Sequence, residues 1–284
     1  NVQARIIDDL EEDPNNVIIG LNKRNTQVHD PYRVNINDGT MKMIAENPGN
    51  ISSWMTDHDG KLRIAITSDG VNTSILHRIS ETEKFKPILT TDFKESVSPL
   101  FFTFDNKGLY VSSNRDRDKA SIFEFDLNEG KEGKLLFEHN EVDVSELMFS
   151  KKRNVLTGVS FTVAKREMVF FDLWREDIQN KLEKELPGYE VGITSFSKDE
   201  SKAVVVTYGD RSRGTYYYYD IKRNILTKLG EISPWLNEID MAEMNPIKYE
   251  SRDGLTIHGY LTLPKGSKGK NLPVVVNPHG GPWA

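Results

Sequence analysis

The sequence predicts an all-β fold of the β-propeller class, followed by the first strands of a second domain. Three observations carry this prediction. Two independent sequence markers recur about every 45 residues. One segment alone has a convincing helical periodicity, and the pattern changes after residue 240. We therefore expect a propeller at 1–240, incomplete at its amino end, and the start of a truncated second domain at 241–284.

The first marker is a strand of aromatic or β-branched residues that runs into a polar turn. Its equivalent positions are Asn35, Arg78, Asp126, Asp172 and Asp220. The second marker is a polar turn followed by a strand, which begins at Asp59, Asp105, Lys152 and Asp199. This period, with about four short strands per repeat, is typical of propellers, in which each blade is a small antiparallel sheet beside a central channel. The count is about four complete blades and a partial first blade at 17–44, so the propeller is expected to start upstream of Asn1.

An insertion between two blades, residues 175–186, is predicted to be a helix. Its apolar residues at helical spacing are Ile178, Leu182 and Leu186. This spacing places them on one face. Asp177 precedes Lys181 by one helical turn, where opposite charges pair. Pro187 and Gly188 are expected to end the helix.

The residues after 240 have a different pattern from the repeat. Residues 241–246 have the composition of a linker. Two strands, 247–250 and 255–263, flank the turn Arg252-Asp253-Gly254, which predicts a β-hairpin. Apolar and polar residues alternate along the second strand, so we expect it to be half-buried.

A short β-branched run at 274–276 predicts a fully buried strand. It leads into Pro278-His279-Gly280-Gly281-Pro282, where the prolines fix the direction of the chain and the glycines let the backbone approach a ligand closely. Taken alone, this loop is explained equally well as a surface turn that ends a strand.

The composition, 37% hydrophobic and 28% charged, is that of a soluble globular protein. The net charge of -6 gives no reason to expect a nucleic-acid partner. No apolar run approaches the ~18 residues of a membrane span, so no membrane partner is expected either. The absence of cysteine excludes disulfides, thiolate metal sites and a cysteine nucleophile. Neither a metal nor a cofactor is expected, because the histidines lack metal-ligand spacing: they are His29, His58, His77, His139, His258 and His279.

Two segments carry a family resemblance, Ser251-Arg-Asp-Gly-Leu-Thr-Ile-His-Gly-Tyr-Leu-Thr-Leu-Pro and Asn277-Pro-His-Gly-Gly-Pro-Trp-Ala. With the propeller period before them, the chain resembles the prolyl oligopeptidase family of serine peptidases, in its acylaminoacyl-peptidase and dipeptidyl-peptidase-like branch. The resemblance spans essentially the whole chain. It implies a β-propeller followed by an α/β-hydrolase domain, whose first strands lie at 241–284. It also implies that the propeller restricts the active site to short peptides.

The resemblance gives the glycine-rich loop a role. In α/β-hydrolases the loop after the third strand supplies one of the two N–H groups that hold the oxyanion. In this chain the N–H of Gly281 would be that donor, and Gly280, His279 and Pro282 would shape the loop.

The chain departs from the family pattern in one respect. A Gly-x-Ser-x-Gly nucleophile motif is absent, and the nearest approach, Gly158-Val-Ser-Phe-Thr, lacks the second glycine and falls in a blade strand. Because the acid and the histidine follow the serine in this fold, all three are expected beyond Ala284. We therefore expect this chain alone to be inactive, as a fragment of a longer enzyme or one piece of a cleaved one. Its expected partners are the missing hydrolase domain and short peptide substrates.

Two other functions fit part of the sequence. A non-catalytic propeller of the WD-repeat or TolB-like kind would account for the repeats but not for the segment after 240. A propeller glycosidase would need paired carboxylates on inner strands. Within the peptidase reading, aminopeptidase, dipeptidyl peptidase and endopeptidase activity stay open. So do the compartment, cytoplasmic or periplasmic and secreted, and the oligomeric state.

Four polar or aromatic segments outside the loop are further candidate sites. Glu11-Glu12 resembles the acidic pair with which some dipeptidyl peptidases hold a substrate's amino terminus, but its turn, rich in acidic residues and proline, favours solvated surface. Residues 115–118, Arg-Asp-Arg-Asp, are better explained as a charged hairpin tip than as channel-facing groups. The tyrosines at 216–219 favour blade packing over a binding platform. His258 is predicted to lie on the surface.

Overall fold

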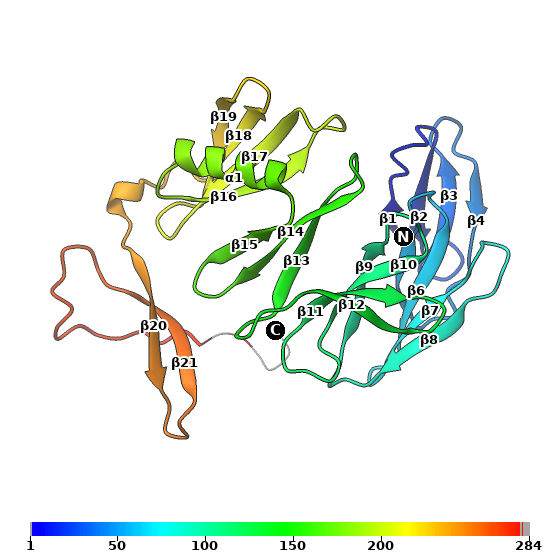
Figure 1. Cartoon of the computed structure of the whole chain (residues 1–284), viewed down its shortest axis with the longest axis horizontal. Coiled ribbons are helices and arrows are strands. Elements are labelled where there is room, and N and C mark those ends of the chain that lie inside the picture. Colours follow the sequence, from blue (N-terminus) through cyan, green and yellow to red (C-terminus); the bar gives the residue numbers. More distant parts are fainter. Residues whose placement is uncertain (1, 279, 281–284) are drawn as a thin grey trace. The chain divides into compact units, whose positions relative to one another are not determined.

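The computed structural model describes residues 2–278 and 280. The chain divides into two compact units, 1–171 (unit 1) and 172–284 (unit 2). Both units are built from antiparallel sheets in which the strands follow one another in chain order (Figure 1). The fold is a β-propeller, as the repeat predicts. The division into a propeller at 1–240 and a hydrolase start at 241–284 stays a prediction.

Within the described residues, unit 1 holds four sheets, which we number blades 1 to 4. Blade 1 consists of β1 (Ala4–Asp8), β2 (Asn16–Leu21), β3 (Asp30–Asn35) and β4 (Met41–Met43). Blade 2 consists of β5 (Ile51–Thr56), β6 (Leu62–Ser68), β7 (Thr73–His77) and β8 (Lys86–Thr91). Blade 3 consists of β9 (Val97–Phe102), β10 (Gly108–Ser113), β11 (Ser121–Asp126) and β12 (Lys131–Phe137). Blade 4 consists of β13 (Val144–Ser150), β14 (Val155–Thr162) and β15 (Arg166–Phe170).

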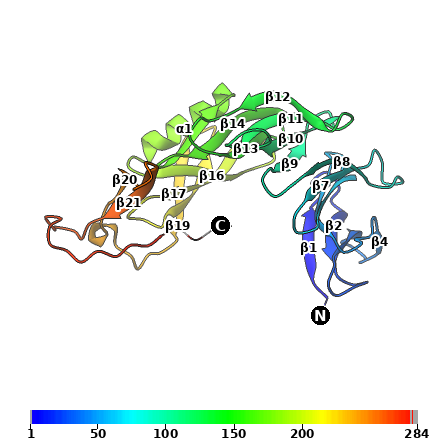
Figure 2. The same ribbon diagram turned by 90° about the horizontal axis from the view of Figure 1, so that it is seen from below.

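Neighbouring blades of unit 1 share apolar cores. Ile64 of blade 2 belongs to one buried cluster with Phe102 and Leu109 of blade 3. Tyr110 of blade 3 belongs to another with Val159 of blade 4, and Figure 2 shows these two blades next to each other. A single small sheet has no core of its own, so each blade depends on its neighbour for burial.

In three blades the turn of the second marker is closed by a backbone hydrogen bond across its base. The N–H of Asp57 bonds the carbonyl of Lys61, that of Thr103 bonds Gly108, and that of Ser197 bonds Lys202, each at 2.9 Å. The repeated polar turns therefore correspond to the hairpins between the first and second strands of the blades.

Unit 2 begins with the predicted helix, α1 (Leu173–Glu185). Blade 5 follows, with β16 (Glu190–Phe196), β17 (Lys202–Tyr208), β18 (Thr215–Asp220) and β19 (Ile225–Glu231). The Asp172 side chain caps the helix by accepting the N–H of Arg175. The predicted apolar face is buried against Val205 and Tyr219 of blade 5, and its residues are Ile178, Leu182 and Leu186. Asp177 pairs with Lys181 as predicted.

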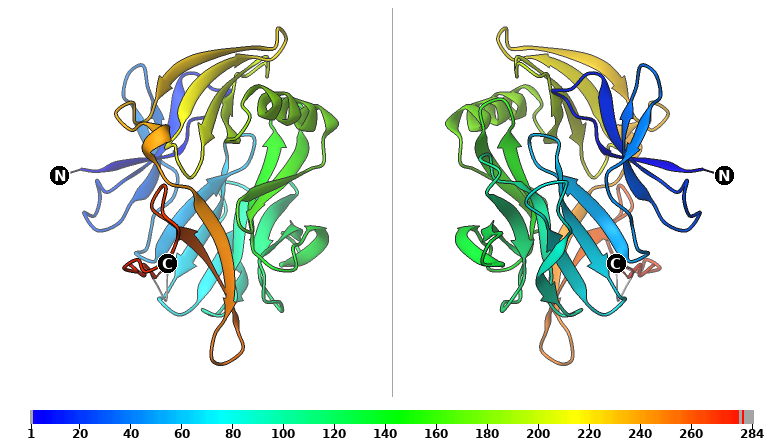
Figure 3. Two further views of the ribbon diagram at one scale, coloured as in Figure 1. Left: turned by 90° about the vertical axis from the view of Figure 1, so that its left-hand side faces the viewer. Right: turned by 90° about the vertical axis from the view of Figure 1, so that its right-hand side faces the viewer.

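A short 3-10 helix, η1 (Glu238–Asp240), leads from blade 5 to the predicted hairpin of β20 (Met244–Glu250) and β21 (Thr256–Thr262). Figure 3 shows these two strands as a long ribbon of their own. The predicted half-burial of the second strand is found only at Ile257, which is partly buried, whereas Leu255, Leu261 and Leu263 are exposed. The two strands form a two-stranded sheet of their own.

The predicted buried strand at 274–276 is also wrong. These valines are in no strand, and their side chains are 80 to 92% exposed. A buried strand needs neighbours on both edges, and the described part of the chain gives this segment none.

The incomplete blade is not the one that the sequence predicted. Blade 1 was expected to be partial, but β1 completes it by pairing with β2. The three-stranded blade is blade 4, where α1 follows β15 in the chain position of a fourth strand. Over residues 2–278 and 280, the total of four full blades and one partial blade agrees with the count from the repeat.

Candidate functional site

The loop expected to hold the oxyanion is mostly outside the described residues. Gly281, His279 and Pro282 lie outside them, while Gly280 is solvent-exposed. The roles assigned to these residues therefore stay predictions.

The serine nearest to a nucleophile motif is part of a blade. Ser160 lies in β14 and is buried. Its hydroxyl donates to Glu146 at 3.2 Å and accepts from Arg166. In the serine-peptidase triad the serine hydroxyl hydrogen-bonds a histidine that acts as its base. Ser160 has Glu146 and Arg166 as partners instead, which favours a structural role.

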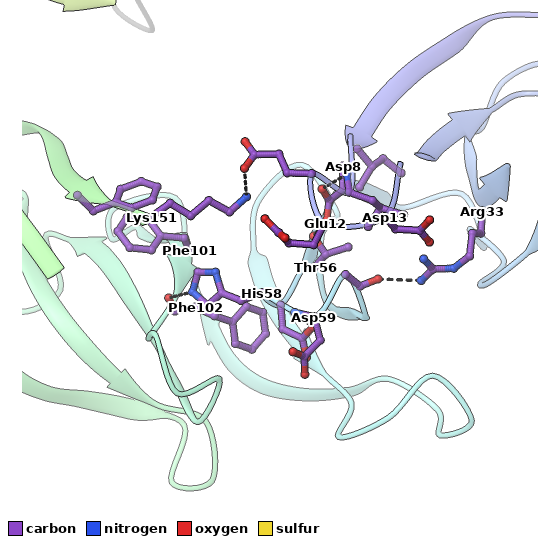
Figure 4. Close-up of a pocket in the computed structure, with 16 residues that line it drawn as sticks. Asp8, Glu12, Asp13, Arg33, Thr56, His58, Asp59, Phe101, Phe102 and Lys151 are labelled. Atoms are coloured by element: carbon purple, nitrogen blue, oxygen red, sulfur yellow. Dashed lines mark hydrogen bonds and ion pairs between the residues drawn. The ribbon is translucent and has the colours of Figure 1, made fainter. Parts of the chain in front are cut away.

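The structure contains a pocket of about 580 Å³ that lies wholly in unit 1 (Figure 4). It is formed by the turn between β1 and β2, the turn between β5 and β6, and residues at the ends of β9 and β13. Equivalent parts of all four blades of unit 1 therefore meet around one cavity.

The β1–β2 turn forms the acidic wall of this pocket. Leu10 anchors the turn: it is buried, it adopts a left-handed φ of 51°, and its N–H donates to Asp8 at 2.9 Å. Asp13 accepts from the Asn16 amide at 2.8 Å, and this hydrogen bond is the main cause of its lowered pKa. The turn thus presents Glu11 and Glu12 at its tip.

The β5–β6 turn forms the second wall and joins blade 2 to blade 3. His58 Nε2 lies 3.0 Å from the carbonyl oxygen of Phe102, and its backbone N–H donates to Asn106 Oδ1 at 3.0 Å. Asp57 is buried and is paired with Arg63. These contacts hold the turn in place from two directions.

Aromatic rings form the third wall. The rings of Phe101 and Phe149 lie 4.2 Å apart between centroids, in blades 3 and 4. Phe104 approaches both and stacks with His58 at 5.8 Å. Phe149 is 41% exposed, so part of this cluster is open to a ligand.

An ion pair joins blade 4 to blade 1 at this pocket. Lys151 Nζ, in the turn after β13, lies 3.0 Å from Glu11 Oε2 (Figure 4). Three other carboxylates that line the pocket, Asp8, Glu12 and Asp13, form no ion pair among the described residues, and the lining cation Arg33 pairs with Glu81. Asp8 accepts from the hydroxyl of Thr56 at 2.6 Å, a neutral donor. The pocket therefore retains uncompensated negative charge.

Sequence reasoning placed Glu11-Glu12 on solvated surface, and both are exposed as predicted. It missed that they line a pocket. The residue that completes this wall, Lys151, lies three blades further along the chain, and no local pattern connects the two turns.

The remaining candidates have structural roles. Residues 115–118 form a turn between β10 and β11, where Arg117 pairs with Glu132. Of the four tyrosines in β18, Tyr219 is buried in the core of unit 2, whereas Tyr216 is exposed. His258 is exposed, as predicted.

The described residues contain neither a metal-binding cluster nor a membrane-spanning helix. No group of three or more histidine, aspartate or glutamate side chains could hold a metal ion in the described part of the chain. Over the same residues, none of the helices has both the length and the apolar character needed to cross a membrane.

No protein-family model matches the chain. Over 283 residues it is 31% identical to dipeptidyl aminopeptidase BIII of Pseudoxanthomonas mexicana, a match that covers 95% of this chain and 40% of that protein. Its structure is similar to that of prolyl oligopeptidase B from Galerina marginata, with a TM-score of 0.58 at 11% identity over 93% of this chain and 38% of that one. The chain belongs to the prolyl oligopeptidase family. It corresponds to the propeller portion of the family.

Two further peptidases are similar to this chain, one in sequence and one in structure. Dipeptidyl peptidase family member 6 of Caenorhabditis elegans is 22% identical over 260 residues, 87% of this chain and 35% of that protein. A puromycin-hydrolyzing peptidase of Mycobacterium tuberculosis shares the fold, with a TM-score of 0.55 at 13% identity over 88% of this chain and 42% of that one. The chain thus spans 40% or less of the curated relatives that it matches.

Proposed function

We propose that this chain is the substrate-gating portion of a serine peptidase that hydrolyses short peptides, with the nucleophile outside residues 1–284. The observation that carries the proposal is the similarity to dipeptidyl aminopeptidase BIII over nearly the whole chain. The alternatives of a binding platform and a glycosidase gain no support from any relative reported above.

The β20–β21 hairpin supports the same proposal. It leads away from blade 5, and several of its apolar side chains are exposed, including Tyr249 and Tyr260. Exposed apolar surface of this kind marks a site of protein contact. A hydrolase domain that follows the hairpin would cover it.

The proposed chemistry is acyl transfer. A serine of the hydrolase domain attacks the peptide carbonyl, and a histidine takes its proton and returns it to the leaving amine. The Gly281 N–H would hold the negative charge that develops on the carbonyl oxygen. The propeller contributes by admitting peptides and excluding folded proteins.

The test uses a longer protein that contains the residues following Ala284, together with this chain alone. The longer protein is expected to cleave an eight-residue peptide, to lose this activity on treatment with a fluorophosphonate, and to leave an intact folded protein uncleaved. This chain alone is expected to cleave neither. Peptide cleavage by this chain, or fluorophosphonate-resistant cleavage by the longer protein, would contradict the proposal.

A further inference from the structure

We propose that the pocket of unit 1 binds a lysine or arginine side chain of a peptide. Glu12 and Asp8 would supply the anionic groups, and the Phe101–Phe149 ring pair would supply the apolar wall. This inference deepens the proposed function, because it names a class of peptide that the propeller of such a peptidase would select.

The first argument is the size and charge of the pocket. At about 580 Å³ it is within the range of cavities that hold small ligands, about 300–1,000 Å³. Asp57 and Asp59 are neutralised by Arg63 and Lys61. No described cation pairs with Glu12, and Figure 4 shows its carboxylate in the pocket, on the side that faces His58 and Phe101. A cationic ligand would complete this charge distribution.

The second argument is the aromatic wall opposite the carboxylates. The rings of Phe101 and Phe149 are in contact and are tilted by 33° to each other, and Phe149 is partly exposed. A cation near an aromatic face is attracted by the ring, and a planar guanidinium also stacks on it. A long aliphatic stem that ends in a cation matches both walls at once, whereas a bare ammonium group would leave most of the pocket empty.

Lys151 of this chain already places an aliphatic stem that ends in a cation at this pocket. Lys151 extends past Phe101, and its ammonium group reaches the acidic turn at Glu11, 3.0 Å away (Figure 4). Both side chains are partly exposed, so the pair can exchange with solvent and with a ligand. The ammonium group of Lys151 therefore occupies part of the acidic wall, and a basic ligand side chain would compete with it there.

The experiment measures binding of three amidated peptides to this chain by fluorescence anisotropy at low salt. Ac-Gly-Gly-Arg-Gly-amide carries the basic side chain. A citrulline peptide of the same sequence keeps the shape without the charge, and Gly-Gly-Gly-Gly-amide with a free amino terminus carries the charge on the backbone. Each peptide is labelled with the same dye at a carboxyl-terminal linker. We expect binding of the arginine peptide, and at least about fivefold weaker binding of the other two.

Three variants locate the site. Glu12→Gln is expected to weaken binding of the arginine peptide roughly fivefold. Asp9→Asn removes the same charge from the same turn at a residue that does not line the pocket, and it is expected to leave affinity within about twofold. Lys151→Met keeps the stem and removes the competing charge, so binding is expected to strengthen about two- to fivefold.

Four outcomes would overturn the proposal: equal binding of the arginine and citrulline peptides, preference for the free amino terminus, equal effects of Glu12→Gln and Asp9→Asn, or weaker binding in Lys151→Met. Circular dichroism of each variant checks that it remains folded. The test reads binding and not catalysis. Failure here leaves fluorophosphonate-sensitive cleavage by the longer protein untouched, and failure of that cleavage leaves the binding result untouched.

Discussion

His77 Nε2 lies 3.2 Å from Nη2 of Arg63 inside unit 1. A guanidinium can only donate, so the histidine nitrogen accepts and the ring is neutral. Burial, and then the charge of Arg63, lower the pKa of His77 from 6.5 to about 4, against a small opposing effect of Glu83. Between these two pH values His77 is therefore neutral in the folded chain and protonated in the unfolded chain.

This relationship predicts a pH-dependent stability. The pKa of His77 is lower in the folded chain than in the unfolded chain. Its contribution to the free energy of unfolding is therefore fully present above about pH 6.5 and is lost as the pH falls toward 4. Between pH 7.5 and pH 5 we expect a loss of roughly 2 kcal/mol in the free energy of unfolding, measured by urea denaturation. His77→Gln should remove this part of the pH dependence, whereas His258→Gln, at an exposed site, should retain it. Identical pH profiles for the wild type and His77→Gln would contradict the assignment.

The packing of α1 on blade 5 predicts a large effect of one leucine. Leu182 is fully buried in the core of unit 2. Leu182→Ala should lower the free energy of unfolding by roughly 2–5 kcal/mol, because it removes buried methyl groups and leaves a cavity. Leu173→Ala, at a position that is 82% exposed on the same helix, should change it by less than about 0.5 kcal/mol. Chemical denaturation compares the two, and similar losses would argue against this packing.

Gly39 and Gly130 have the same backbone conformation but different surroundings, so substituting each distinguishes the effect of backbone strain on stability from that of steric contact. Gly39 and Gly130 end the same turn in blades 1 and 3, with φ of 73° and 63°, and each N–H bonds the residue four positions earlier at 2.9 Å. A Cβ on Gly39 would meet no atom within 4 Å, whereas a Cβ on Gly130 would lie 2.2 Å from the carbonyl oxygen of Ile88.

Alanine at either glycine should cost about 1–2 kcal/mol for the left-handed backbone. Gly130→Ala should cost roughly 1–3 kcal/mol more, because blade 2 must move away from the turn. Thermal and urea unfolding measure both variants. Equal destabilisation would contradict the close approach of Ile88 to this turn.

The proposed oxyanion donor makes a kinetic prediction for a longer, active protein. Gly281→Pro removes the N–H and should lower kcat about 10²- to 10³-fold with a smaller change in KM, since the lost contact forms in the transition state. Gly281→Ala retains the N–H and should lose less. Equal loss in both variants would argue that the residue only shapes the loop.

The elements that follow from local pattern were predicted well. The spacing of Ile178, Leu182 and Leu186 predicted the helix, and those side chains are buried in the structure. The polar turns predicted the blade hairpins because each turn and its strands are adjacent in sequence. The strand at 4–8 was missed because it is short and mostly exposed, so it lacks an apolar pattern.

The sequence did not predict features that depend on contacts between residues far apart in the chain. The valines at 274–276 predicted burial, but burial requires neighbouring strands that the described residues do not supply. The pocket was missed because Glu11 and Lys151 come together only when blades 1 to 4 are assembled. Sequence pattern specifies a turn, whereas the pairing of two turns depends on the geometry of the repeat.

If this chain supplies the propeller and another segment supplies the nucleophile, the position of a fluorophosphonate adduct will show it. The longer protein is labelled, digested and analysed by mass spectrometry. We expect one modified serine, located after Ala284. An adduct on any serine of residues 1–284, Ser160 included, would contradict it.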